Sequence, residues 1–167
     1  LLAGLGLTIC YRTGLTSIGA EGQIIMGGLM ATIVGVYFGG MPRYLLIPVA
    51  MIAAMIAGGA WAGIAGYLKA KLGVSEVINT IMLNYIALFF VAYLVDGPLR
   101  EPPGFYPQSP LLVKGAWLSY LIKGTRMHTG VLIAAAAVIV VYFLLWKSPL
   151  GYQMRAVGYN SIAARTN

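Results

Sequence analysis

The sequence predicts an all-α integral membrane protein: a polytopic helical bundle with about four complete transmembrane helices plus one truncated or broken helix. The main observation is a set of four stretches without Asp, Glu, Lys or Arg, which cover 22–42, 44–68, 77–95 and 127–146. A hydrocarbon core ~30 Å thick requires about 20 apolar residues in a helix to cross it. The composition agrees, because the chain is 60% hydrophobic and 9% charged, whereas soluble domains are about 25% charged. A soluble fold is therefore excluded.

The first 23 residues are expected to contain an interrupted helix. Residues 1–11 are apolar but too short to span a bilayer, which indicates the tail of a truncated helix, and 12–23 (RTGLTSIGAEGQ) mix glycines, charges and small polar residues. Irregular backbone at membrane depth is tolerated where it is buried in protein or lines a cavity, and transporters use such breaks as binding sites. Alternatively, this is an ordinary interfacial turn, with Glu21 capping the next helix and Arg12 as its ion partner. The residues leave both interpretations open.

The first two complete spans, expected at 22–41 and 44–68, carry small residues at intervals of four. Residues at i and i+4 share one face of a helix, and small residues at such positions let membrane helices approach closely. We therefore expect tight helix–helix packing through these residues, which are Gly27, Ala31, Gly35 and Gly39 in the first span and Ala54, Gly58, Ala62 and Gly66 in the second.

The third span, expected at 77–95, contains polar side chains at membrane depth: Asn79, Thr80 and Asn84. An unpaired amide in hydrocarbon is costly. Two interpretations remain open, because these groups either form interhelical hydrogen bonds or line a polar path for a solute. The fourth span, at 129–147, is apolar and is expected to face lipid over much of its surface.

The link at 96–128 holds five of the eight prolines, so its first half is expected to be irregular. Its second half, 111–123, has the composition of an amphipathic helix lying in the membrane interface. The net charge of +7 comes from Lys and Arg that flank apolar segments, as orientation signals do. No basic run is interleaved with aromatic residues, so nucleic-acid binding is rejected. A single cysteine and a single histidine offer no metal-ligand cluster.

Three motifs in order resemble permease subunits of bacterial ABC importers, in the group that carries branched-chain amino acids, simple sugars and nucleosides. They are RTGLTSIGAEGQIIMGGLMA (12–31), KAKLGVSEVINTIMLNYIALFFVAYLVDGPLRE (69–101) and KSPLGYQMRAVGYNSIAAR (147–165). The form R-x-G-L-x-x-I-G-x-E-G-Q followed by E-V-I-x-T-I-M-L-N-Y-I-A looks most like nucleoside or simple-sugar permeases that work with a basic-membrane-lipoprotein type receptor. The chain departs from the pattern at Ser17, where relatives usually carry Asn.

The resemblance implies that 1–167 form a single transmembrane permease domain, an internal fragment of about half a permease. It implies no catalytic activity and no cofactor in this chain, because a cytoplasmic ABC ATPase binds and hydrolyses ATP. The other expected partners are a second permease subunit, homologous or identical, an extracytoplasmic solute-binding lipoprotein and the lipid bilayer. The expected location is the bacterial inner membrane, with 69–76 and 148–167 cytoplasmic and 96–128 external.

The resemblance also assigns candidate sites. Residues for the solute path, on the nucleoside interpretation, are Glu21, Gln23, Asn79, Thr80, Asn84 and Tyr85. Contact with the ATPase falls on the 148–165 loop, at Arg155, Gly158, Asn160, Ala163, Ala164 and Arg165, where small residues let a short helix sit in a groove and arginines pair with acidic groups. The alternatives are a sugar or branched-chain amino acid permease, an ion-coupled secondary transporter, for which only Glu21 offers an acid at a span, and a structural subunit without a path.

Overall fold

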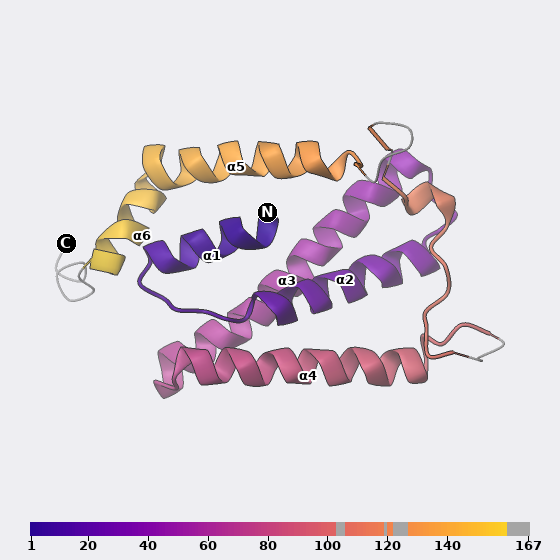
Figure 1. The fold of residues 1–167 in the computed structure, drawn as a ribbon, viewed down its shortest axis with the longest axis horizontal. Helices are drawn as coiled ribbons and strands as arrows, with labels where there is room; N and C mark the ends of the chain where they lie inside the picture. The colour runs from indigo at the N-terminus through magenta and orange to yellow at the C-terminus, as the bar shows by residue number, and fades with distance from the viewer. Residues whose placement is uncertain (103–105, 119, 122–126, 160–167) are drawn as a thin grey trace. The chain divides into compact units, whose positions relative to one another are not determined.

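The computed structural model of the protein describes residues 1–102, 106–118, 120–121 and 127–159 (Figure 1). Within these residues the regular structure consists of six α-helices and one 3-10 turn. The elements are α1 (Leu2–Arg12), α2 (Ala20–Tyr37), α3 (Arg43–Leu72), α4 (Glu76–Asp96), η1 (Lys114–Ala116), α5 (Gly130–Lys147) and α6 (Pro149–Tyr159). The prediction of an all-α protein is confirmed.

Four of these helices are long and apolar enough to cross a membrane: α2, α3, α4 and α5. They coincide with the four predicted spans, with ends that differ by a few residues. The 30 residues of α3 correspond to a length of about 45 Å, which exceeds the ~30 Å hydrocarbon core. Its last turn carries the exposed Lys69 and Lys71, and therefore suits the polar edge of a bilayer.

The chain divides into two compact units. One comprises Glu21–Trp117, with α2, α3, α4 and η1. The other combines Leu1–Ala20 with Leu118–Asn167 and contains α1, α5 and α6.

In the unit Glu21–Trp117, α3 and α4 form an antiparallel hairpin (Figure 1). Gly73 ends α3 in the left-handed conformation, with φ of +65°, and its N–H donates a hydrogen bond to the Lys69 carbonyl oxygen. A glycine in this conformation is a common helix stop, because it carries no Cβ to clash. Glu76 then begins α4. The short turn brings the polar start of α4 beside the end of α3.

An amphipathic helix was predicted at 111–123, of which 119 and 122–123 lie outside the described residues, and the described part differs from that prediction. The regular structure of 111–117 is only the 3-10 turn Lys114–Ala116. Leu112 and Val113 come instead against α2, where they face the backbone of Gly35 and Gly39. Side chains at two successive positions reach α2 because this part of the chain is not helical. The prediction of a helix was wrong for this reason: contact with a glycine-lined surface replaces the interfacial helix.

In the other unit, α5 passes into α6 through a tight turn. The Ser148 hydroxyl donates to the Leu144 carbonyl oxygen at 2.6 Å and accepts a hydrogen bond from the Gly151 N–H at 3.1 Å. A Cβ at Gly151 would overlap the Leu144 carbonyl oxygen, so the turn requires glycine there. Helix α1 packs against both α5 and α6. The ends of three helices therefore meet beside this turn.

Candidate functional site

The start of α2 meets α3 and α4 at a polar contact. The Gly22 N–H donates a hydrogen bond to Asn84 Oδ1 at 2.9 Å. A Cβ built on Gly22 would lie 2.8 Å from that oxygen and 3.0 Å from Trp61 Nε1. Gly22 therefore allows side chains from two other helices to reach the backbone of α2. We call these three residues, Gly22, Trp61 and Asn84, the α2 junction.

The α2 junction contains an unsatisfied donor. Trp61 Nε1 is buried and has no hydrogen-bond partner among the described residues. Leaving a buried donor unpaired costs about 1–3 kcal/mol. The indole N–H is therefore a donor whose acceptor is not among the described residues. Trp61 was not among the predicted site residues, although an indole N–H inside a 25-residue uncharged stretch is a signal that a partner is needed.

Two other polar side chains of α4 are used in packing. Asn79 is 8% exposed, and its Nδ2 donates to the Ala65 carbonyl oxygen of α3 at 3.1 Å. Thr80 is 2% exposed, and its hydroxyl donates to the Glu76 carbonyl oxygen of its own helix at 2.8 Å. Asn79 thus joins α4 to α3, and Asn84 joins α4 to α2. The interpretation as interhelical hydrogen bonds describes Asn79 and Asn84.

The remaining predicted path residues are not brought into one cluster. Glu21 is exposed in the first turn of α2. Gln23 is half-buried, and its backbone carbonyl faces Gly58 of α3. Tyr85 is adjacent to Asn84 in sequence, but its side chain is 56% exposed. Gly22 and Asn84 therefore connect the two predicted polar segments, and Glu21 and Tyr85 lie on the outer surface of this unit.

Helices α2 and α3 approach each other closely at two glycines. A Cβ on Gly27 would lie 3.1 Å from the Ala54 carbonyl oxygen, and one on Gly58 would lie 3.1 Å from the Gln23 carbonyl oxygen. The other small residues differ in their surroundings. Gly35 and Gly39 face Leu112 and Val113, and no atom lies within 4 Å of the Cβ position of Gly66. Ala31 and Ala62 are half-buried.

The predicted ATPase-contact segment is described only in part. Arg155 lies on α6 with its guanidinium 4.6 Å from the centre of the Trp146 ring. Gly158 lies against α1, since a Cβ there would overlap the Arg12 carbonyl oxygen. The other four predicted residues, Asn160, Ala163, Ala164 and Arg165, lie outside the described residues.

These features define a polytopic helical membrane protein with a break between α1 and α2 and a polar contact at the start of α2. The family described as branched-chain amino acid transport system / permease component matches residues 1–167. The chain belongs to this family, and it is a multi-pass protein of the plasma membrane.

Three permeases of known transporters are similar to nearly the whole of this chain. The chain is 39% identical over 168 residues to the guanosine ABC transporter permease protein NupP of Bacillus subtilis, covering 99% of this chain and 48% of the relative. It is 37% identical to the glucose ABC transporter permease protein TsgB13 of Haloferax volcanii (99% and 46%). It is 33% identical to the nucleoside ABC transporter permease protein NupB of Lactococcus lactis (98% and 47%). The chain spans about half the length of these relatives. No solved structure matches it.

Proposed function

We propose that the chain is part of the permease subunit of an ATP-driven importer for nucleosides. The observation that carries this proposal is identity along nearly the whole chain to a guanosine permease, 39%, and to a nucleoside permease, 33%. A simple sugar is the second candidate, since the glucose permease relative is 37% identical. Branched-chain amino acids and an ion-coupled mechanism have no comparable support among these relatives.

The chemistry of the α2 junction supports a neutral polar solute. A nucleoside offers hydroxyls, ring nitrogens and carbonyl oxygens, which pair with amides, hydroxyls and indole N–H groups rather than with ions. The unpartnered Trp61 Nε1 and the nearby Asn84 amide provide such groups, with Gln23 one residue after Gly22. We place the α2 junction on the solute path, with Trp61 added to Gln23, Asn84 and Tyr85. Asn79 and Thr80 are assigned to packing.

The proposal includes the partners that an importer requires. A cytoplasmic ATPase binds and hydrolyses ATP, a second permease subunit completes the path, and an extracytoplasmic lipoprotein delivers the solute. Residues 69–76 and 148–167 are then cytoplasmic, and 96–128 are external. The exposed Lys69 and Lys71 and the basic residues Lys147 and Arg155 support this orientation, because basic side chains close to span ends favour the cytoplasmic side.

The substrate is tested with the full-length permease, reconstituted with its ATPase and binding protein. ATP-dependent accumulation of labelled adenosine and guanosine is measured with ribose, glucose and leucine as competitors. We expect nucleoside uptake that an excess of these competitors does not suppress. Uptake of glucose or ribose without nucleoside uptake would support the importer class but refute the assignment of a nucleoside as the substrate.

The coupling segment is tested separately. Arg165→Glu combined with Ala164→Asp places two acids where a basic, small-residue contact with the ATPase is proposed. We expect uptake to be abolished while the binding protein still delivers solute to the outer face. The matched control is Lys71→Glu, which reverses one charge at the cytoplasmic end of α3. Full uptake by the double variant would contradict the proposal that this segment couples the permease to the ATPase.

A further inference from the structure

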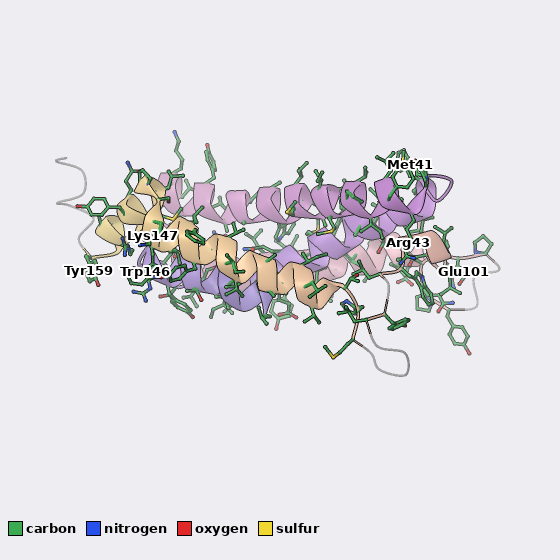
Figure 2. The ribbon with its side chains drawn as sticks, turned by 90° about the horizontal axis from the view of Figure 1, so that it is seen from above. Met41, Arg43, Glu101, Trp146, Lys147 and Tyr159 are labelled. Atoms are coloured by element: carbon green, nitrogen blue, oxygen red, sulfur yellow. The ribbon has the colours of Figure 1, made fainter. Side chains whose placement is uncertain are left out.

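Two arginines from different helices share one tryptophan ring. The guanidinium carbons of Arg12, at the end of α1, and Arg155, in α6, lie 5.5 Å and 4.6 Å from the centre of the Trp146 ring in the last turn of α5. Figure 2 labels Trp146 and Lys147 at this end of α5, and Tyr159 at the end of α6. Both arginines are within the distance at which a cation is attracted to an aromatic face. Three helices thus concentrate positive charge at one place.

This charge has no acidic partner within its own unit. Residues 1–20 and 118–167 contain Arg12, Lys123, Arg126, Lys147, Arg155 and Arg165 but no Asp or Glu. The four acids of the chain, Glu21, Glu76, Asp96 and Glu101, all belong to the other unit. Arg155 is directed by a hydrogen bond from its Nε to the Gly151 carbonyl oxygen at 3.3 Å. A negative charge that neutralises this cluster therefore comes from outside this unit.

We infer that Arg12, Trp146 and Arg155 form a binding site for the phosphodiester headgroup of an anionic phospholipid. Trp146 and Lys147 end a helix of spanning length, so they lie at the level of the headgroups, where tryptophan is enriched. Basic pockets between membrane helices bind anionic headgroups. A guanidinium donates two parallel hydrogen bonds to phosphate oxygens. Trp146 is 49% exposed, which leaves room beside the ring.

The position favours a lipid over the acidic surface of a partner protein. The cluster is built on the last turn of α5 itself, because the Ser148 turn brings α6 directly back beside that helix end. Headgroups lie at the depth of this helix end, whereas a cytoplasmic protein reaches first the groups farther from the bilayer. The inference does not depend on which solute is carried, so it can fail or hold independently of the proposed function.

The experiment uses the full-length permease, delipidated in detergent and examined by native mass spectrometry. It is titrated with phosphatidylglycerol, with phosphatidylcholine of the same acyl chains, and with inorganic phosphate as competitor. We expect one phosphatidylglycerol to be retained in preference to phosphatidylcholine. Retention that inorganic phosphate at millimolar concentration abolishes would overturn the lipid assignment in favour of a free phosphate site. Equal retention of both lipids would overturn it altogether.

Variants assign the retained lipid to this site. We expect Arg12→Gln with Arg155→Gln to weaken phosphatidylglycerol binding about 25-fold, since each basic side chain near an anionic headgroup contributes on the order of fivefold. The control, Lys69→Gln with Lys71→Gln, removes two exposed cations from another helix end and should leave the affinity unchanged. An equal loss in the control would show unspecific attraction and refute the site.

A conservative pair keeps the test decisive if the glutamine variant does not fold. Arg12→Lys with Arg155→Lys retains both charges but loses the planar fork and much of the stacking, so about threefold weaker binding is expected. Unchanged lipid affinity in this pair contradicts the proposed geometry. If the double glutamine variant loses ATPase binding but keeps its affinity for phosphatidylglycerol, the two arginines contact the ATPase and the lipid site is refuted.

Discussion

Substitution of Gly22 by alanine tests the close approach of α2 to α3 and α4. The added Cβ would lie 2.8 Å from Asn84 Oδ1, 3.0 Å from Trp61 Nε1 and 3.3 Å from Asn84 Cα. The first two contacts are relieved if the side chains move. The third is with backbone and is relieved only if α2 and α4 separate. The substitution therefore breaks the hydrogen bond from the Gly22 N–H to Asn84 Oδ1 and opens the junction.

The expected destabilisation combines two effects. Overpacking by one methyl group in a close contact costs about 1–3 kcal/mol. The lost hydrogen bond between membrane helices contributes on average about 0.6 kcal/mol and at most about 1.7 kcal/mol. The gain in helix propensity from Gly to Ala offsets at most about 1 kcal/mol. The net expectation is a loss of about 2 kcal/mol in the free energy of unfolding.

The control lies on the same helix, because no atom approaches within 4 Å of the Cβ position of Gly28. Both variants are made in the full-length permease, and unfolding is followed in mixed micelles as the fraction of SDS increases. Gly28→Ala should be neutral or slightly stabilising. In an Asn84→Ala background, Gly22→Ala should cost about 1 kcal/mol less, since neighbouring residues are coupled. Equal unfolding midpoints for Gly22→Ala and Gly28→Ala would refute the close contact of Gly22 with Asn84 and Trp61.

Three further substitutions test packing, the first two in the same unfolding assay and the third by uptake. Gly58→Ala should lower the free energy of unfolding by about 1–3 kcal/mol, because its Cβ would meet the backbone of α2. The control Gly59→Ala should not, because no atom lies within 4 Å of its Cβ position. Similar values for the two variants would contradict the contact of α3 with α2. Asn79→Ala should lower the free energy of unfolding by about 0.6–1.7 kcal/mol, because the hydrogen bond to the Ala65 carbonyl oxygen is lost. An unchanged unfolding midpoint would contradict a stabilising role for that hydrogen bond. Gly158→Ala should separate α6 from α1 and lower uptake at an unchanged amount of permease; normal uptake would contradict a role for this contact.

The spanning helices were predictable because a bilayer imposes one length on every apolar helix, and uncharged stretches report that length directly. The small-residue pattern predicted close packing but not the partner of each residue. Gly27 and Gly58 contact the neighbouring helix, whereas Gly35 and Gly39 are covered by Leu112 and Val113 of the link between α4 and α5. A glycine permits the approach of any chain, so periodicity alone does not identify which segment arrives.

The candidate site was predictable only in its polar residues. Asn84 was identified because an amide in an apolar span needs a partner, but that partner, the Gly22 N–H, lies 62 residues away. Trp61 was missed because tryptophan counts as apolar in a hydropathy pattern. That its buried Nε1 lacks an acceptor among the described residues depends on the surroundings of the side chain in the folded protein, which hydropathy does not report.

Substitution of Trp61 by phenylalanine separates a role in the solute path from a role in packing. Removing Asn79 or Asn84 breaks a bond between helices, so lower uptake after either change is ambiguous. Phenylalanine instead keeps an aromatic ring in place while it removes the unpartnered N–H together with part of the bicyclic indole, so any loss of stability reflects lost packing and uptake is compared per folded permease. If that N–H binds the solute, the apparent affinity for guanosine should fall about fivefold, equivalent to one hydrogen bond of about 1 kcal/mol, while the maximal rate per folded permease is retained. An unchanged affinity for both guanosine and glucose would place the α2 junction outside the solute path and leave it as a packing contact.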